Sequence, residues 1–391
     1  GQGFRNPRQQ RVMNDLEKAL KDGLDRLAEE NLSRTLEPGA GLDFTSNDYL
    51  GLSTAPGFRE RINALIENQP LSAPASRLLR GTHPAHLDLE KKLAEFKGTE
   101  AALIFPTGYQ ANLGLLSALL GPEDRVLSDE LNHASIIDGL RLSGAQKCIF
   151  PHLDLNRIEE ELSRPHPGGR TFIVTESYFS MDGDIAPLGD YAELAEKYSA
   201  ALVVDDAHAT GLFGDVRGSG LAEEFGVESS CSAIVSTFGK ALGSFGAFVG
   251  GSRVLIDWLI NRSRPFIFST ATPPLLLGMM EAGVDLCGDP GARTRLHSLA
   301  ERLRNALSAG GIDCSASRGP IVPVIIGSNE AALDAAGKLG EEGFDVRAIR
   351  PPTVAPGSAR LRISVHADHC ENDIDRLAAR VLRILTQEKT G

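Results

Sequence analysis

The segment Ala201-Leu202-Val203-Val204-Asp205-Asp206-Ala207-His208 decides the fold of this chain. Its first four residues form an uninterrupted apolar run, which is typical of a strand buried on both faces of a parallel sheet. Its last four residues are mostly polar and follow the strand at its carboxyl end. Because ligands of open α/β sheets bind at the carboxyl ends of the strands, this segment predicts a buried sheet with a ligand site at its edge.

Similar runs of strand length occur on both sides of this segment. They are Val126–Ser128, Thr171–Thr175 and Ala233–Ser236. Apolar residues at helical spacing predict helices between and before them, marked by Leu188, Tyr191, Leu194, Ala195 and Tyr198 and by Leu89, Leu93 and Phe96. Strands that alternate with helices predict an α/β fold, in which a mostly parallel sheet is covered by helices.

The two ends of the chain follow other patterns. Leucines at positions 16, 20, 24 and 27 predict an opening amphipathic helix, which ends before the loop Glu37–Gly41. After about residue 285, two helical patterns surround strand-like runs over 321–326 and 360–365. We therefore expect an N-terminal helical segment over 1–50, a large domain over 51–285 and a smaller C-terminal α+β domain over 286–391.

Composition and charge exclude several classes of protein. The chain has 40 Lys and Arg against 52 Asp and Glu, a net charge of −12, which argues against nucleic acid or an anionic membrane as a partner. No uninterrupted apolar run reaches the roughly 18 residues of a membrane span, and residues 1–15 lack the pattern of a signal peptide. Its five cysteines are an odd number without a CxxC motif, so we expect reduced packing thiols in a cytoplasmic protein.

Polar residues follow three of the predicted strands. They are Asp205–His208, Thr237–Lys240 and Glu176–Gly183. A single acidic residue after a strand is most often a helix N-cap. Three polar segments at the same edge of one sheet predict a site instead.

Lys240 is the residue that indicates the chemistry of this site. It lies between Gly239 and two further glycines, Gly243 and Gly246, which leave room for a planar ligand. A lysine whose basicity is lowered by its site can form a Schiff base with a carbonyl. A P-loop is excluded, because Ala241 stands where such a loop has Ser or Thr.

A Schiff-base lysine, an acid and a phosphate site together indicate pyridoxal 5'-phosphate (PLP) as cofactor. Asp205 would keep the pyridine nitrogen protonated, and His208 would donate to the ring hydroxyl. The segment Thr107–Asn112 predicts a loop that enters a helix, whose backbone N–H groups would face the phosphate. Thr237 lies three residues before Lys240 and could offer its hydroxyl to the same phosphate.

With these residues assembled, the chain resembles the α-oxoamine synthase family of fold-type I PLP enzymes over residues 42–388. The motifs that carry the resemblance agree in order and spacing; they are Thr45–Leu52, Asn132–Ser135, Ser180–Gly183, Asp205–Gly211 and Thr237–Lys240. The resemblance implies a PLP-dependent acyltransferase with a large PLP-binding domain and a smaller C-terminal domain.

The resemblance also implies a role for each matching residue. Lys240 would bind the cofactor and later move the Cα proton of the amino acid, while His133 would lie on the ring face and support the acyl oxygen. The remaining assignments are Asp205 to the pyridine nitrogen, His208 to the ring oxygen, Gly108, Tyr109, Ser180 and Thr237 to the phosphate or ring, and Asn47, Arg350 and Thr353 to the amino acid.

The segment Ala348–Val354 resembles the members of the family that condense L-alanine with a pimeloyl thioester, of CoA or a carrier protein, in biotin synthesis. That resemblance implies a homodimer with small-molecule substrates, in which residues 72–81 reach the partner's site. Two alternatives stay open: a glycine C-acyltransferase that makes 2-amino-3-oxobutyrate, and a non-catalytic PLP-binding relative. The presence of Lys240, Asp205, His208 and His133 argues against the second.

The chain departs from the family pattern in two places. The glycine-rich loop near residue 75 is replaced by Leu71–Arg77, in which Pro74 restricts the backbone. The arginine that meets the acyl substrate in relatives matches Arg34 best, with Arg26 as the alternative. Two histidine pairs, at 83 and 86 and at 366 and 369, have the spacing of metal half-sites, but we expect them to lie in the loops before two helices.

Overall fold

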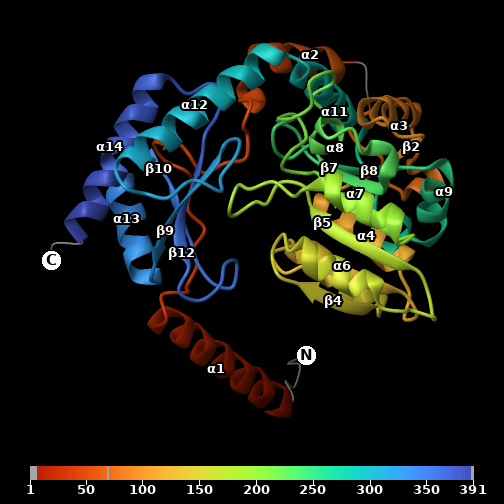
Figure 1. Ribbon diagram of the computed structural model, residues 1–391, viewed down its shortest axis with the longest axis horizontal. Coiled ribbons are helices and arrows are strands. Elements are labelled where there is room, and N and C mark those ends of the chain that lie inside the picture. Colours follow the sequence, from red (N-terminus) through yellow and green to blue (C-terminus); the bar gives the residue numbers. More distant parts are fainter. Residues whose placement is uncertain (1–6, 68–69, 389–391) are drawn as a thin grey trace, which may run out of the picture.

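The computed structural model describes residues 7–67 and 70–388, and it shows a central sheet of seven strands (Figure 1). The order across the sheet is β2-β8-β7-β6-β5-β3-β4. The strands are β2 (Ala101–Phe105), β3 (Arg125–Asp129), β4 (Gln146–Phe150), β5 (Thr171–Glu176), β6 (Ala201–Asp205), β7 (Cys231–Thr237) and β8 (Ala247–Gly251). All neighbours pair in parallel except β8, which is antiparallel to both β2 and β7.

Successive residues of the central strands enter two different hydrophobic cores. Leu202 and Val204 of β6 pack in one core, whereas Val203 packs in the other. The same alternation holds in β5, where Ile173 packs in the first core and its neighbours Phe172 and Val174 pack in the second. Because both faces are buried, the strands are apolar throughout, and the predicted α/β class with a mostly parallel sheet is confirmed.

Helices cover both faces of this sheet (Figure 1). They are α2 (Pro56–Ile66), α3 (Pro84–Lys97), α4 (Gly108–Leu119), α5 (Ala134–Ser143), α6 (Leu155–Ser163), α7 (Leu188–Lys197), α8 (Leu221–Glu224), α9 (Arg253–Arg262), α10 (Arg264–Ile267) and α11 (Pro274–Cys287). Short turns of helix also occur at Leu52–Thr54, Arg77–Gly81 and Glu228–Ser230.

The C-terminal part forms a second layer structure beside the large sheet (Figure 1). Its antiparallel sheet has the order β11-β12-β9, from Arg347–Ile349, Ala359–Ser364 and Ile321–Gly327. Its helices are α12 (Pro290–Ala309), α13 (Asn329–Glu341) and α14 (Glu371–Glu388). The short strand β1 (Leu42–Asp43) pairs with β10 (Phe344–Asp345), which ties the N-terminal segment to this part. The expected boundaries at residues 50 and 285 stay a prediction.

Helix α1 (Pro7–Glu29) projects away from the rest of the chain (Figure 1). The predicted leucine stripe at 16, 20, 24 and 27 lies on it, and these side chains are exposed. No helix of the residues that the structure describes is long and apolar enough to span a bilayer.

The prediction that both histidine pairs lie in loops before helices is confirmed for His83, His366 and His369, but it is wrong for His86, which lies in the first turn of α3. His83 caps α3 by accepting from the Ala85 N–H. In the second pair, His369 accepts from the His366 N–H through Nδ1 (3.1 Å) and donates to the Asp43 carbonyl through Nε2 (2.8 Å). Both nitrogens of His369 are therefore engaged in hydrogen bonds.

The prediction that all five cysteines are packing residues is wrong for one of them. Cys231, Cys287 and Cys314 are buried and Cys148 is partly buried, but Cys370 is exposed and its thiol donates to Asp373 Oδ2 (2.9 Å). Cys370 lies immediately before α14, where the chain is at the surface. All five thiols are free.

Candidate active site

The predicted cofactor residues come together at the carboxyl ends of β5, β6 and β7. Glu176 pairs with Asp205 in the register of β5 and β6, and Thr237 ends β7. Lys240 follows in a glycine-rich turn, in which Gly243 has a φ of 61° that glycine adopts without strain. The parallel sheet therefore places four functional groups at one edge, although they are far apart in the sequence.

Asp205 is held by main-chain and side-chain donors. Its Oδ1 accepts from the Ala207 N–H (3.0 Å), and its Oδ2 accepts from Asn112 Nδ2 (2.5 Å) on α4. The same Asn112 amide donates to Ser135 Oγ (3.0 Å), which lies 2.8 Å from His133 Nδ1. One chain of hydrogen bonds thus connects the carboxylate of Asp205 to the imidazole of His133.

The pKa values of His133 and His208 are both lowered in this site, which favours their neutral forms. His133 Nδ1 accepts from the Ser135 N–H (3.2 Å), so the neutral ring carries its proton on Nε2. Burial, together with the positive charge of Lys240, lowers the pKa of His133, against the opposing effect of Asp205. Burial and the charge of Lys240 also lower the pKa of His208 well below its ordinary value, and its Nδ1 lies 2.9 Å from the Tyr49 hydroxyl.

Lys240 has the electrostatic environment of a nucleophilic lysine. Within the part of the chain that the structure describes, its amine makes no hydrogen bond or ion pair. Burial of the ammonium lowers the pKa of Lys240 to about 8, although Asp205 and Glu176 act in the opposite direction. A fraction of this amine is therefore unprotonated near neutral pH, as attack on a carbonyl requires.

Glu176 was not among the predicted site residues. Its burial, and then the negative charge of Asp205, raise the pKa of Glu176 to about 8. A raised pKa favours the protonated form of Glu176 near neutral pH. Its position next to a buried strand was visible in the sequence, but its distance from Asp205 depends on the register of the sheet.

The predicted phosphate loop begins helix α4. Thr107 is the N-cap and accepts from the Gln110 N–H (3.2 Å), so the first N–H groups, at Gly108 and Tyr109, remain for an anion. A Cβ placed on Gly108 would lie 3.9 Å from both Cβ and Oγ1 of Thr237, which shows that the two predicted phosphate residues are neighbours with room between them. The Tyr109 side chain turns outward and bonds Asp138.

A buried arginine that the sequence analysis did not select completes the group. Arg362 of β12 donates to Asn47 Oδ1 and to the Tyr49 hydroxyl, both at 3.0 Å, and to the Ser180 carbonyl at 2.5 Å. It brings the predicted residues Asn47 and Ser180 to the C-terminal sheet. The alternation of Arg360 and Arg362 in a fully buried strand was the signal that could have found it.

Three predicted substrate residues lie together in a different place. Arg350 donates to the carbonyls of Asn31 and Ser33, and Arg34 donates to the Pro351 carbonyl (3.2 Å). Thr353 is exposed in the same turn. Burial and the nearby charge of Arg34 lower the pKa of Arg350. Among the described residues, Arg350 bonds only to carbonyls of the N-terminal segment, and no hydrogen bond joins it to Asn47.

The residues present fit PLP. They provide a lysine amine without a partner among the described residues, a fixed carboxylate, two imidazoles and the beginning of a helix beside Gly108 and Thr237. The hydroxyl of Ser244 and the side-chain oxygen of Gln110 are also buried without a partner among the described residues. This set corresponds to the aldehyde, ring nitrogen, ring oxygen and phosphate of the cofactor.

Comparison with known proteins agrees with this fit. Residues 40–381 match the model of the class I and II aminotransferases. A protein of Geobacter sulfurreducens named 8-amino-7-oxononanoate synthase is 43% identical over 383 residues, covering 94% of this chain and 98% of the relative. A putative 8-amino-7-oxononanoate synthase of Geobacillus kaustophilus is 45% identical and covers 92% of each chain.

The chain belongs to the 8-amino-7-oxononanoate synthase family. It is therefore a PLP-dependent acyltransferase of fold type I. A solved 8-amino-7-oxononanoate synthase of Francisella tularensis has a TM-score of 0.78 and 27% identity, and covers 89% of this chain and 99% of its own. A serine palmitoyltransferase of S. paucimobilis with PLP bound has a TM-score of 0.86 and 28% identity, covering 94% and 96%.

Proposed function

We propose that this enzyme joins L-alanine to a pimeloyl thioester and releases 8-amino-7-oxononanoate, CO2 and the thiol. The observation that carries the proposal is the cluster of Lys240, Asp205, His208 and His133 in a chain of this family. In this reaction the Cα–H bond of alanine breaks, a bond from Cα to the acyl carbon forms while the thioester C–S bond breaks and the thiol leaves, the Cα–carboxylate bond then breaks to release CO2, and a proton returns to Cα. When bound, PLP accepts the electrons of the broken bonds into its ring.

The residues of the chain divide the remaining work. Lys240, with a pKa of about 8, takes the Cα proton and later returns one. Asp205 holds a proton on the ring nitrogen, and Asn112 fixes the carboxylate for this purpose. The Nε2–H of His133 is free to donate to the acyl oxygen, because Nδ1 is engaged with Ser135.

Arg362 is the better candidate for the carboxylate of alanine. Its guanidinium is buried next to Asn47, Tyr49 and the His208 imidazole, whereas the guanidinium of Arg350 bonds carbonyls of the N-terminal segment. An arginine fork suits a carboxylate because it can donate two parallel hydrogen bonds. We assign Arg350, Thr353 and Arg34 instead to the acyl substrate, whose thioester carrier is anionic.

The substrate assignment can be tested by product formation. CO2 release should be measured with alanine, glycine and serine against acyl thioesters of several lengths. The proposal expects alanine with the pimeloyl thioester to give the highest kcat/KM. A preference for glycine with acetyl-CoA would replace it with the glycine C-acyltransferase alternative, and a PLP spectrum without any turnover would indicate a non-catalytic relative.

A homodimer is the second part of the proposal. Residues 71–79 and their neighbour Phe268 expose large apolar side chains: Leu71 is 65% exposed, Leu79 83% and Phe268 71%. A bridge between Ser76 and Thr270 joins these two segments, so their exposed apolar side chains belong to adjacent segments. Such a surface is typical of a protein–protein interface.

Complementation between subunits tests this dimer. A Lys240→Ala chain mixed with a chain carrying an inactivating substitution at Ser76 should regain activity if the loop acts on the partner's site. Ser76 is the better choice than Arg77, because Arg77 makes a buried bidentate ion pair with Glu90 (2.8 and 3.0 Å) and its loss would unsettle the fold. A fully active monomer in light scattering would contradict the proposal.

A further inference from the structure

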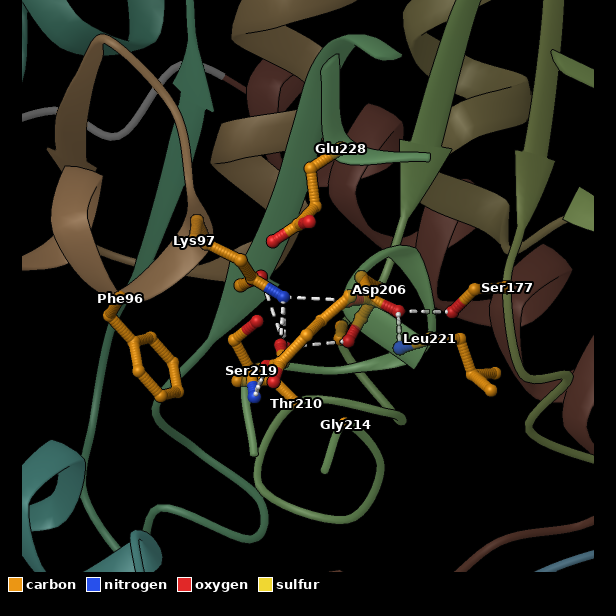
Figure 2. A network of polar contacts seen from close by, with 12 residues as sticks. Phe96, Lys97, Ser177, Asp206, Thr210, Gly214, Ser219, Leu221 and Glu228 are labelled. Carbon is orange, nitrogen blue, oxygen red and sulfur yellow. Dashed lines mark hydrogen bonds and ion pairs between the residues drawn. The ribbon is translucent and has the colours of Figure 1, made fainter. Parts of the chain in front are cut away.

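A second lysine–aspartate pair lies directly behind the active site. Lys97 at the end of α3 is fully buried, and its ammonium donates to Asp206 Oδ2 (2.6 Å), to Thr210 Oγ1 (3.0 Å) and to the Ser219 carbonyl (Figure 2). All three protons of the ammonium therefore have an acceptor. Asp206 is 0% exposed and is the residue next to Asp205.

The other carboxylate oxygen of Asp206 is also occupied. Oδ1 accepts from Ser177 Oγ (2.5 Å) and from the Leu221 N–H (3.2 Å), as Figure 2 shows. The main chain of Asp206 is bound as well: its N–H donates to the Val235 carbonyl (2.8 Å), and its carbonyl accepts from the N–H groups of residues 209 and 210. Every polar group of Asp206 thus has a partner: its carbonyl closes the turn 205–210, and its N–H and carboxylate fasten that turn to the surrounding elements.

This turn carries two of the residues assigned to the cofactor. Asp205 points to the face of the sheet covered by α4, from which Asn112 donates, whereas Asp206 points to the face covered by α3. Asp206 directly follows the last residue of β6, and its N–H still bonds the Val235 carbonyl of β7; because successive side chains of an extended segment point to opposite faces, fixing the direction of Asp206 also restricts that of Asp205. His208 lies inside the turn that the Asp206 carbonyl closes.

Stability alone gives no reason for charges at this position. A buried ion pair costs so much desolvation that apolar residues of similar volume often serve the fold equally well. The Lys97–Asp206 pair fastens the turn 205–210 through side-chain and main-chain bonds. Such a pair can restrict the directions of the neighbouring residues Asp205 and His208.

We propose that Lys97 and Asp206 are positioning residues, which orient Asp205 and His208 toward the PLP ring. This inference rests on the proposed roles of Asp205 and His208. Neither Lys97 nor Asp206 touches the cofactor in this proposal. They act through the turn 205–210, so they should influence the electronics of the bound cofactor and the loss of the Cα proton, but not the affinity for alanine.

The decisive variant is the double substitution Lys97→Met with Asp206→Leu, measured in the holoenzyme. It removes both charges together and so leaves no unpaired buried charge to unfold the protein. We expect the midpoint pH of the absorbance change near 420 nm to shift, and alanine Cα–H exchange to slow by about 10–100-fold, because a misplacement of about 1 Å can cost about 10²-fold. The KM for alanine should stay within about threefold of the wild type, since no substrate contact is lost.

Two further variants control this experiment. Ser177→Ala removes one hydrogen bond to Asp206 and keeps the ion pair, so it should shift the midpoint in the same direction by less. Arg217→Met breaks an ion pair with Glu228 and a bond to the Phe96 carbonyl in the same corner, without a contact to the turn 205–210 among the described residues. It should leave the spectrum and the exchange rate unchanged.

The outcomes separate this inference from the proposed function. Suppose that Asp205→Asn slows alanine Cα–H exchange as proposed. A stable double variant with an unshifted midpoint and an exchange rate within about twofold of wild type would then overturn the positioning role. If Asp205→Asn itself exchanged at the wild-type rate, the proposed role of Asp205 would fail, and this inference with it. A shift of equal size in Arg217→Met would also overturn it, because the effect would then be a general one of that corner.

Discussion

Two lysine–aspartate pairs lie back to back at the end of β6, and they differ in how completely their charges are satisfied. Lys97 and Asp206 have a partner for every polar atom and are fully buried. Lys240 has no partner among the described residues, and burial lowers its pKa to about 8, while Asp205 is fixed by Asn112 and a main-chain N–H.

The difference shows how one short segment can provide both a scaffold and a reactive site. The ammonium of Lys97 donates to three acceptors, so all of its protons are used in contacts that hold the structure in place. An ammonium that has lost its water without gaining acceptors releases its proton more easily. The reactivity of Lys240 therefore follows from its lack of hydrogen-bond acceptors among the described residues, whereas Lys97 has three.

The largest contrast should come from truncating the two lysines. Lys240→Ala should lower turnover by at least about 10³-fold, because both the attachment of the cofactor and the general base are lost. It should barely affect the denaturation midpoint. Lys97→Ala should lower the free energy of unfolding by about 3–5 kcal/mol, because Asp206 is left buried and unpaired. Urea unfolding and borohydride trapping of the cofactor measure the two effects, and label on a lysine other than Lys240 would contradict the assignment.

Neutralising Asp205 tests the second member of the Lys240–Asp205 pair. Asp205→Asn should retain the cofactor but slow alanine Cα–H exchange by about two orders of magnitude or more, roughly 1.4 kcal/mol for each factor of ten. An amide cannot hold the proton on the ring nitrogen. Proton exchange followed by NMR gives the rate, and a variant within about threefold of wild type would refute the role.

The third charge near this pair is Arg362, and lysine should replace it poorly. Arg362→Lys keeps the charge but loses the fork, so we expect the KM for alanine to rise by about 10–100-fold for a charge-assisted hydrogen bond of about 1.5–3 kcal/mol. Arg350→Lys is the matched control and should change that KM by less than about threefold. The reverse result in steady-state kinetics would return the carboxylate to Arg350.

The charged form of His152 also has hydrogen-bond partners, and its contribution should be measurable in the free energy of unfolding. His152 bonds Asp129 Oδ1 (2.9 Å) and Asp184 Oδ2 (2.8 Å); burial opposes its charge, but these bonds prevail and raise the pKa of His152 to about 10. Because the folded pKa is above the unfolded value of 6.5, this stabilisation is full below about pH 6.5 and is lost as the pH rises through about 10.

His152→Gln should accordingly lower the free energy of unfolding by about 2 kcal/mol at pH 6, a typical value for hydrogen bonds to a charged group. The difference from wild type should shrink as the pH rises above about 6.5 and vanish beyond about pH 10. Urea unfolding at several pH values measures it. A difference that does not change with pH would mean that His152 is neutral in the fold.

The smallest effect concerns the unprotonated fraction of Lys240. When the protein without cofactor is mixed with PLP, the rate at which the absorbance near 420 nm appears should fall about tenfold for each pH unit below about 8, and level off above it. The sign follows from the nucleophile, which is the unprotonated amine. A rate that keeps rising to pH 10 would show that the pKa of Lys240 is not lowered, and would remove the contrast with Lys97.

Most of the fold could be predicted from the sequence. The runs around Val203 and Ile234 are apolar throughout because both faces of the sheet are covered, and this pattern is local. The antiparallel direction of β8 could not be predicted in the same way, because the pattern of apolar residues does not depend on strand direction.

The residues of the candidate site likewise divide into those that local sequence predicts and those that only tertiary contacts place. Lys240, Asp205 and His208 were found because each follows an apolar run directly, and the residue types themselves indicate PLP chemistry. Glu176, Tyr49 and Arg362 were missed as site residues, since their place depends on register or on contact between distant segments.

The sequence by itself determined the class of fold, the cofactor and the family, because these depend on residue types at short spacing along the chain. Only the tertiary structure decided which of two neighbouring aspartates faces which lysine, and which arginine lies beside His208. Strand pairing and helix packing bring together residues as far apart as Asn47 and Arg362, and hydrogen bonds act over about 3 Å of space regardless of the distance along the chain.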